Sequence, residues 1–337
     1  MYQISLITGD GIGPELSDSV TKVLQTVNDK LNLKLEIEKL EAGDKALAKT
    51  GKALPESTLQ AVTKSDACLK APVGESAADV IVVLRRMLNL YANIRPAKSY
   101  PNMPALKDDI DLVIVRENTE DLYTGMEFDV GNTAVALRTI SEEASKRIAK
   151  YAFLVAAQRE KGKVTCVHKS NVMRKTDGLF SKVCGEVARE FPKIQFEQMY
   201  VDACAMNLIR QPESFDVIVT TNLYGDILSD EAAQVVGGLG MAPAANIGDS
   251  FALFEPVHGA AFDIAGKQAA NPSSFILSAK MMFEWLGMKN KDKKCFEVAK
   301  KLESAVYGVV KDGIKTKDIG GDKTTAEFTQ YVISNLA

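Results

Sequence analysis

Histidine is rare in this sequence, and its cysteines follow no recognisable pairing pattern. The 337 residues include only two histidines and five cysteines, and no two cysteines have the C-x-x-C spacing of redox or zinc motifs. A metal site in this chain must therefore rely mainly on carboxylates, which favours Mg²⁺ or Mn²⁺ over zinc. Free, buried thiols are typical of a reducing compartment, so we expect a cytoplasmic location.

Long apolar runs and an excess of positive charge are absent as well. No run reaches the roughly 18 residues that a membrane span needs, and no basic segment followed by an apolar one precedes the first strand-like run. The formal net charge is −3, which gives no indication of nucleic-acid binding. The length suggests about two globular domains. We expect neither a membrane nor a nucleic acid as partner.

Strand-like and helix-like segments alternate along the chain. Pro14 predicts the start of a helix that runs to Leu31, and Ser141 predicts the cap of a helix through Gln158. Residues 4–7 form a strand-like run, and short β-branched runs typical of buried parallel strands occur at 112–115, 164–167 and 217–219. The pattern predicts an α/β protein in which helices cover the faces of a sheet.

Residues 9–13 place a glycine-rich turn between the first strand and the first helix. Backbone N–H groups of such a turn can hold a phosphate. The spacing is G-x-G-x-G, however, and the third glycine position of the dinucleotide fingerprint is missing. A plain tight turn is the alternative, and a Rossmann site is not expected.

Three arginines lie in or beside predicted secondary structure. Arg85 falls in a helix, Arg95 lies in the segment after it, and Arg116 follows the run 112–115, with Tyr123 nearby. An arginine fork binds a carboxylate through two hydrogen bonds, so three of them indicate a small polyanionic substrate. Taken singly, each arginine would be more typical of a surface ion pair.

Three aspartates are candidates for a metal site. Asp202 follows a strand, and Asp226 and Asp230 share one face of a predicted helix because they are four residues apart. Like charges at that spacing are unfavourable unless a cation offsets them, which is the pattern of Mg²⁺ ligands. A solvated acidic face is the alternative.

Two further segments carry candidate chemistry. Lys169 follows the run 164–167, at the sheet edge where α/β proteins hold active sites. A partly buried lysine can act as a base, whereas an exposed lysine is the alternative. Residues 255–267 are predicted to form a loop, in which small residues beside His258 allow a planar ring to approach. Asp263 in that loop could accept hydrogen bonds from ribose hydroxyls.

These motifs, in this order, closely resemble those of the β-decarboxylating hydroxyacid dehydrogenases, the family that includes isopropylmalate, isocitrate and homoisocitrate dehydrogenases. The resemblance spans the chain from Gly9 to the turn at 320–322. It implies a two-domain α/β fold that is not a Rossmann fold, with the active site in the cleft between the domains. It also implies NAD, Mg²⁺ or Mn²⁺, and a homodimer or larger assembly whose subunits share active sites.

The resemblance assigns roles to the candidate residues. Arg85, Arg95 and Arg116 would bind the substrate carboxylates, and Tyr123 and Lys169 would be the acid/base pair. Asp202, Asp226 and Asp230 would surround the metal, with Lys169 and Asp202 contributed across the subunit interface. The cofactor would be held by Asn171, Glu255, His258, Gly259, Ala261, Asp263, Ile264 and Asn271.

Two stretches suggest where the chain crosses between domains. Residues 96–104 carry three prolines, and residues 237–240 carry three glycines. If both are crossings, residues 99–237 form a dimerisation and metal/substrate domain. Residues 1–98 and 238–337 then form a discontinuous cofactor-binding domain.

Substrate choice depends on the helix that holds Arg85. Ile81 and Val82 lie on or near the face of Arg85, and their apolar side chains suit an isopropyl group. We therefore expect 3-isopropylmalate, a substrate of leucine biosynthesis, with isocitrate and homoisocitrate as alternatives. A binding protein that only gripped carboxylates would have no use for Tyr123, Lys169 and the aspartates, so an enzyme is expected.

Overall fold

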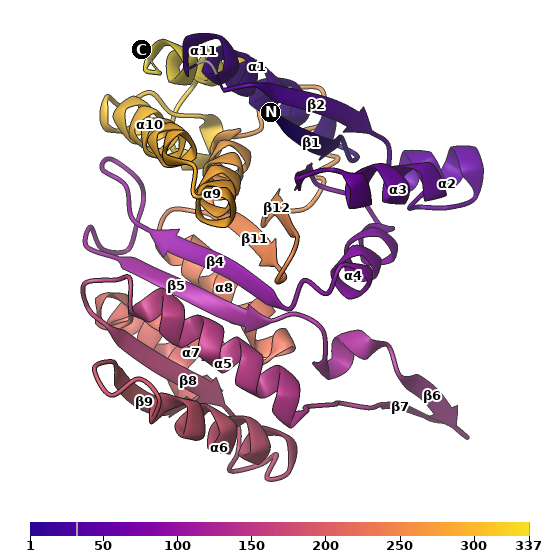
Figure 1. The fold of residues 1–337 in the computed structure, drawn as a ribbon, viewed down its shortest axis with the longest axis vertical. Coiled ribbons are helices and arrows are strands. Elements are labelled where there is room, and N and C mark those ends of the chain that lie inside the picture. Colours follow the sequence, from indigo (N-terminus) through magenta and orange to yellow (C-terminus); the bar gives the residue numbers. More distant parts are fainter. Residues whose placement is uncertain (32, 337) are drawn as a thin grey trace.

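The structure is a computed structural model of the chain and describes residues 1–31 and 33–336. Its strands (Figure 1) are β1 (Tyr2–Ile7), β2 (Leu35–Leu40), β3 (Ala67–Lys70), β4 (Ala92–Lys98), β5 (Asp111–Glu117), β6 (Glu127–Val130), β7 (Thr133–Ala136), β8 (Lys163–His168), β9 (Gln195–Tyr200), β10 (Val217–Thr220), β11 (Pro243–Ile247) and β12 (Ala252–Pro256). Its helices are α1 (Gly13–Leu31), α2 (Asp44–Thr50), α3 (Glu56–Lys64), α4 (Ala77–Met87), α5 (Glu142–Ala156), α6 (Thr176–Ala188), α7 (Val201–Arg210), α8 (Asn222–Val235), α9 (Ser273–Asn290), α10 (Lys293–Lys311) and α11 (Thr325–Ser334), with short 3-10 turns η1 (Asp121–Thr124), η2 (Pro212–Ser214), η3 (Leu239–Met241) and η4 (Lys317–Ile319).

One large sheet runs through the described residues, with the strand order β2-β1-β3-β12-β11-β4-β5-β10-β8-β9. The four strand-like runs of the sequence are the strands β1, β5, β8 and β10, and the last three pair in parallel. The helix starts also agree: α1 begins at Gly13, and the Ser141 hydroxyl accepts a hydrogen bond from the Ala144 N–H at the start of α5. The predicted α/β class is confirmed.

The centre of the sheet contains antiparallel strands that the sequence pattern did not reveal. β4 is antiparallel to both β5 and β11, and β11 is antiparallel to β12. Pro96 and Pro243 lie in these strands in place of a β-branched run, so no periodicity marks them. The reversal brings the start of β4 to the end of β5, where Asn93 stands opposite Arg116.

Helices cover both faces of each half of the sheet (Figure 1). α9 packs on β3, β11 and β12, and α1, α10 and α11 extend that layer, whereas a separate apolar cluster joins α3 and α4 to the opposite face. In the other half, α5 and α6 pack on one face and α7 and α8 on the other. The two halves meet at β4, and the predicted domain limits, 1–98 with 238–337 and 99–237, stay a prediction.

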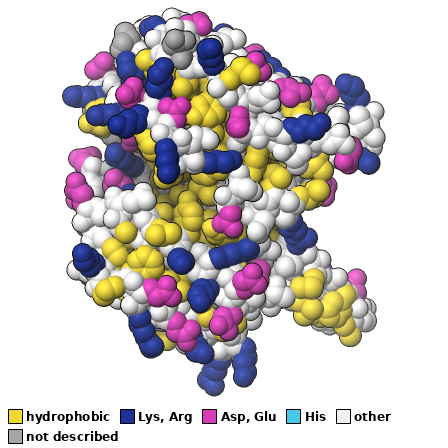
Figure 2. All heavy atoms as spheres, in the orientation of Figure 1, with side chains coloured by type: hydrophobic (Ala, Val, Ile, Leu, Met, Phe, Trp, Pro, Cys, Tyr) yellow, Lys and Arg dark blue, Asp and Glu magenta, His cyan; other side chains and the backbone are white. Residues whose placement is uncertain are grey.

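A two-stranded hairpin, β6–β7, projects from the molecule as an arm (Figure 1). Gly131-Asn132 separates residues 127–130, which alternate polar and apolar, from the mostly apolar residues 133–136, and a Gly-Asn pair between two such runs is a hairpin signal that our sequence reading did not use. Met126, Phe128 and Val130 leave 41%, 49% and 59% of their surface exposed, and apolar side chains are visible on the arm in Figure 2. An isolated two-stranded hairpin is marginally stable in water, and these exposed side chains leave an apolar surface on the arm.

Two expectations about cysteine and the membrane can be compared with the fold. All five cysteines carry free thiols and are buried, as the sequence predicted. Within residues 1–31 and 33–336, no helix is both long enough and apolar enough to cross a membrane.

Candidate active site

A cavity of about 320 Å³ lies where the two halves of the sheet meet. Helix α4, the strands β3, β4, β5 and β12, the turn η1 and helix α8 all contribute to its wall. Ten of the residues predicted for the site line it, namely Ile81, Val82, Arg85, Arg95, Arg116, Tyr123, Asp226, Glu255, His258 and Gly259. The fold thus gathers residues that are up to about half the chain apart in sequence.

The three predicted arginines are buried and are held by polar partners. Arg85, Arg95 and Arg116 are 6%, 8% and 1% exposed. Arg85 donates from Nε to Asn246 Oδ1 (2.9 Å), and Arg116 donates from Nη2 to Asn222 Oδ1 (2.7 Å). Burial lowers the pKa of Arg95 to about 10, with the nearby Arg116 charge acting in the same direction. Buried guanidinium groups in fixed orientations are suited to binding carboxylates of a small ligand.

Asp226 faces these arginines from helix α8. Its carboxylate accepts hydrogen bonds from Arg116 and from the Tyr123 hydroxyl, and Arg95 Nη1 lies 3.3 Å from Oδ1. Burial alone would raise the pKa of the Asp226 carboxyl, but Arg116 and Arg95 outweigh burial and hold it below its usual value. Burial raises the pKa of Tyr123, so the phenol carries its proton at neutral pH and can donate it.

Asp226 and Asp230 share one face of α8, as predicted, and suit a hard cation. Asp230 Oδ1 lies 3.4 Å from Arg95 Nη1, and the two carboxylates are 37% and 55% exposed. Burial and then the Asp226 charge raise the pKa of Asp230 against the effect of Arg95. Partly exposed carboxylate oxygens are ligands that Mg²⁺ and Mn²⁺ accept. Among the described residues no group of three His, Cys, Asp or Glu side chains is placed to hold a metal.

The predicted base lies apart from this cavity and pairs with the third predicted metal ligand. Lys169 Nζ is 2.7 Å from Asp202 Oδ1, and these side chains are 23% and 67% exposed. The ion pair lowers the pKa of Asp202. Neither residue lines the cavity that holds Tyr123, and Asn171, two residues beyond Lys169, is exposed. Within one chain the acid and the base are therefore not together.

A buried network beside Arg85 was only partly anticipated. Lys70, 4% exposed at the end of β3, lies 2.7 Å from Glu255 Oε2, and Arg85 Nη2 lies 3.3 Å from Glu255 Oε1. The sequence reading missed Lys70, although it ends a buried strand just as Lys169 follows one. The predicted loop is wrong at its start, because Glu255 belongs to β12 and is held extended opposite Ala244 of β11.

Glu255 is expected to make stability depend on acid pH. Burial would raise its pKa, but Lys70 and then Arg85 lower it to about 2. This folded-state pKa lies below the unfolded value of about 4.3. The ionised Glu255 carboxylate therefore contributes fully to the free energy of unfolding above about pH 4.3, and this contribution is lost as the pH falls towards 2. The shift corresponds to about 3 kcal/mol.

Denaturant unfolding at pH 2 to 7, followed by circular dichroism, measures this contribution. We expect the free energy of unfolding of Glu255→Gln to fall less steeply below about pH 4 than that of the wild type. Glu36→Gln, on an exposed position of β2, is the control and should follow the wild type. Equal slopes for wild type and Glu255→Gln would contradict the assignment.

The predicted cofactor loop borders the cavity and packs on the glycine-rich turn. His258 and Gly259 line the cavity, and Ala261, Asp263 and Ile264 follow in the loop, with Ala261 at φ +40°. His258 Nε2 lies 3.0 Å from Ser274 Oγ, and Asn271 Nδ2 donates to Asp318 Oδ2 (3.1 Å). The exposed Asp263 carboxylate and the polar groups around His258 suit the hydroxyls and amide of a dinucleotide.

The glycine-rich turn is structural. Three of its backbone N–H groups already have acceptors: Asp10 donates to Pro72 O and Ile12 to Ala260 O, both at 2.8 Å, and Gly13 donates to Asp10 O at 2.7 Å. A Cβ on Gly11, whose φ is +55°, would come within 2.0 Å of Ala260 O, so glycine is required for this close approach. These contacts agree with the tight-turn alternative, and they join the turn to the predicted cofactor loop through Ala260.

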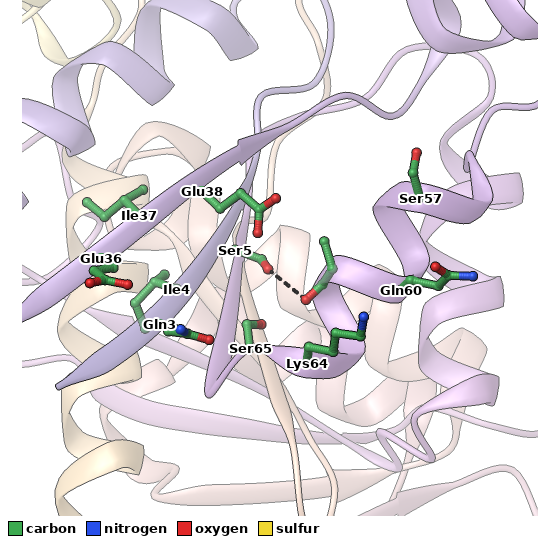
Figure 3. Close-up of a pocket in the computed structure, with 11 residues that line it drawn as sticks. Gln3, Ile4, Ser5, Glu36, Ile37, Glu38, Ser57, Gln60, Lys64 and Ser65 are labelled. Atoms are coloured by element: carbon green, nitrogen blue, oxygen red, sulfur yellow. Dashed lines mark hydrogen bonds between the residues drawn. The ribbon is translucent and has the colours of Figure 1, made fainter.

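A larger cavity, of about 670 Å³, lies elsewhere, over β1 and β2 beside α3. Figure 3 shows polar side chains such as Glu38, Gln60 and Lys64 around it, and the Ser5 hydroxyl donates to the Ala61 carbonyl across one side. None of the predicted site residues lines it. Its chemistry therefore gives no reason to place the active site there.

Three buried arginines, Tyr123 and the carboxylates of Asp226 and Glu255 surround one cavity, and this arrangement suits a small carboxylic acid as ligand. The sequence profile of isocitrate/isopropylmalate dehydrogenase matches residues 3–332. The chain belongs to the isocitrate/isopropylmalate dehydrogenase family, and the resemblance found in the sequence is confirmed. It is therefore a decarboxylating hydroxyacid dehydrogenase, and membership implies a divalent metal and NAD.

Individual relatives match over nearly their whole length. The 3-isopropylmalate dehydrogenase of Saccharolobus solfataricus is 53% identical over 333 residues, covering 98% of each chain. That of Archaeoglobus fulgidus is 52% identical over 336 residues, covering 100% of each chain. The crystal structure of isocitrate dehydrogenase from Methylococcus capsulatus superimposes with a TM-score of 0.93 at 40% identity, covering 100% of this chain and 99% of the other.

Proposed function

We propose that this chain is an NAD-dependent enzyme that oxidises and decarboxylates 3-isopropylmalate to 4-methyl-2-oxopentanoate, a reaction of leucine biosynthesis. The observation that carries the proposal is the cavity wall, where Ile81 and Val82 stand on the same helix as Arg85 and line the same cavity as the other two arginines. Such a wall offers cationic groups to two carboxylates and an apolar surface to a branched alkyl group. The two archaeal relatives named above support the choice. The thiols support a reducing, cytoplasmic location.

The arginines orient the substrate in this proposal. Arg85, Arg95 and Arg116 approach from α4, β4 and β5, so they can bind two carboxylates from several sides. Glu255 and Lys70 cancel each other's charge, which leaves the positive charge of Arg85 available to the ligand. Burial of these guanidinium groups strengthens each contact because little water competes.

Proton transfer is assigned to Lys169 and Tyr123. Lys169 would take the proton from the oxygen of the substrate hydroxyl as hydride leaves the carbon that bears this hydroxyl, and Tyr123 would protonate the enol that remains after CO₂ departs. Asp226 and Asp230, with Asp202 from a second subunit, would hold Mg²⁺ or Mn²⁺, and the loop from His258 to Ile264 with Asn271 would hold NAD. When bound, the metal supplies polarisation of the substrate oxygens and NAD supplies the hydride acceptor.

A homodimer with shared active sites would bring the acid and the base together. Lys169 and Asp202 lie away from the cavity that contains Tyr123, so another chain must deliver them. Exposed apolar side chains on α7 and α8, such as Met206 (57% exposed) and Ile227 (58% exposed), lie on the helices that carry Asp202 and Asp226. Together with the apolar hairpin arm, they offer a surface that a second copy can cover.

Steady-state rates with 3-isopropylmalate, isocitrate and homoisocitrate test the proposal. We expect the highest kcat/KM with 3-isopropylmalate, because a third carboxylate against Ile81 and Val82 would lose its hydration without gaining a partner. A preference for isocitrate or homoisocitrate would show that the proposed substrate is wrong and that the chain acts on another substrate known for its enzyme family. No turnover with any hydroxyacid would favour a protein that only binds carboxylates.

Ile81→Asn is expected to lower kcat/KM for 3-isopropylmalate by about 10-fold or more, because burial of two or three methyl-type carbons contributes about 0.8 kcal/mol each. Val83→Asn is the matched control, since Val83 lies on the same helix but is 38% exposed and does not line the cavity. Its kcat/KM should equal that of the wild type. Equal losses in the two variants would show that the alkyl group does not contact Ile81.

Asp263 is expected to make the enzyme prefer NAD over NADP. An exposed carboxylate can accept hydrogen bonds from ribose hydroxyls and repels a 2′-phosphate. Asp263→Lys should therefore lower the preference for NAD, measured as kcat/KM with NAD divided by kcat/KM with NADP. The Lys267 ammonium donates to the Asp263 backbone carbonyl at 2.7 Å, so its positive charge weakens the repulsion between Asp263 and a 2′-phosphate. Lys267→Gln should therefore raise the preference for NAD. A wild-type preference for NADP would contradict the assignment.

A further inference from the structure

Arg138 lies two residues after the hairpin arm and binds two fully buried carboxylates at once. Its Nε is 2.6 Å from Asp121 Oδ1, and its Nη1 is 2.7 Å from Asp177 Oδ1. Both aspartate side chains are 0% exposed, and that of Arg138 is 13% exposed. Arg138 Nη2 also donates to Thr221 Oγ1 at 2.7 Å. One guanidinium therefore joins three segments that are remote in sequence.

Each partner of Arg138 holds a segment of the proposed catalytic machinery. Asp177 accepts a hydrogen bond from the Lys169 backbone N–H at 2.6 Å, which fixes the chain at the proposed base. Asp121 begins the turn η1 that carries Tyr123, and it does so at a φ of +70°, which is strained for a residue other than glycine. Asp121 Oδ2 also accepts from the Leu223 N–H in the first turn of α8, the helix that carries Asp226.

We propose that Arg138 is a positioning residue that holds the turn of Tyr123, the turn of Lys169 and the start of α8 in one fixed arrangement. The inference rests on the proposed function. If sites are shared, Tyr123 and Asp226 act in the site of their own chain and Lys169 acts in the site of the other. Arg138 then links both active sites of a dimer through each chain. A guanidinium fork can serve acceptors on three segments at once, whereas an ammonium group has no such planar fork.

Arg138→Met and Arg138→Lys test the positioning role by a split between kcat and KM. Misplacement of reacting groups by about 1 Å lowers turnover by about 10²-fold, so we expect a kcat loss of that size for Arg138→Met and a smaller loss for Arg138→Lys. The substrate KM should change by less than about threefold, because Arg138 does not line the cavity of Arg85, Arg95 and Arg116. Both variants are assayed with the hydroxyacid that the wild type turns over fastest.

Arg159→Lys is the matched control. Arg159 also bridges two aspartates, with Nε 2.5 Å from Asp216 Oδ1 and Nη2 2.8 Å from Asp111 Oδ1. These aspartates stand at the starts of β10 and β5, at the edge of the sheet opposite Arg116. We expect Arg159→Lys to lose stability but to keep the wild-type kcat. Unchanged kcat in both Arg138 variants, or an equal kcat loss in Arg159→Lys, would overturn the proposal.

Subunit mixing tests the link between two sites. Arg138→Met subunits are mixed and exchanged with Tyr123→Phe subunits in one experiment and with Lys169→Ala subunits in another. Neither mixture should contain a fully active site, because Arg138→Met displaces both Tyr123 and Lys169 of its own chain. Full restoration in one mixture would show that Arg138 serves one segment only and would overturn the inference. The proposed function is judged separately, by the wild-type substrate rates.

Discussion

Tyr123→Phe and Lys169→Ala should each lower kcat by about 10²- to 10⁴-fold, the usual scale for losing a general acid or base. Phenylalanine keeps the ring beneath the Arg116 guanidinium, whose Cζ lies 5.0 Å from the ring centroid, and removes only the hydroxyl that donates to Asp226. A loss of kcat in Tyr123→Phe is therefore due to the missing hydroxyl proton and not to altered packing of the ring. Steady-state rates at saturating substrate, with folding checked by circular dichroism, provide the measurement.

Matched controls exist for both residues. Lys163 stands at the opposite end of β8 from Lys169, is 22% exposed and pairs with Glu197 at 2.9 Å. The Tyr91 hydroxyl donates to Asp249 at 3.1 Å away from the cavity. Lys163→Ala and Tyr91→Phe should keep the wild-type kcat. A kcat within about threefold of wild type in Tyr123→Phe or Lys169→Ala would remove that residue from the acid/base pair.

Mixing inactive Tyr123→Phe and Lys169→Ala subunits should restore activity. In the shared-site arrangement each heterodimer has one site with both intact residues and one with neither. Random exchange of equal amounts in a homodimer then gives about a quarter of the wild-type activity per chain. This is a large gain over parents that are nearly inactive.

The extent of exchange must be measured independently, for example by native mass spectrometry of mass-tagged subunits. Activity that stays at the level of the parents after proven exchange would contradict shared sites. Mixing Lys169→Ala with a tagged Lys169→Ala chain is the control, and it should remain inactive because no site in it contains the base.

The sequence allowed the local parts of this site to be predicted. Arg116 and Lys169 come directly after or close behind the β-branched runs 112–115 and 164–167, and Asp226 and Asp230 are four residues apart on a helix, so pattern and spacing single them out as candidates. The family resemblance supplied the roles. Ten of the residues assigned in this way line one cavity.

The remaining features depend on contacts between distant segments. Lys70 and Glu255 are 185 residues apart, and no local pattern shows that β3 and β12 become neighbours. Arg138 joins Asp121 to Asp177 for the same reason, and each residue alone resembles a surface charge. β4 escaped recognition because Pro96 interrupts its pattern, and its antiparallel pairing follows from the whole sheet.

The products formed from 3-isopropylmalate and NAD test the central claim most directly. NADH is followed by absorbance, CO₂ by release of label from a labelled carboxylate, and the organic acid by mass spectrometry. We expect one NADH, one CO₂ and one 4-methyl-2-oxopentanoate for each substrate consumed, with a requirement for Mg²⁺ or Mn²⁺. NADH formed without CO₂, or no reaction with 3-isopropylmalate under conditions where another hydroxyacid is oxidised, would contradict the account.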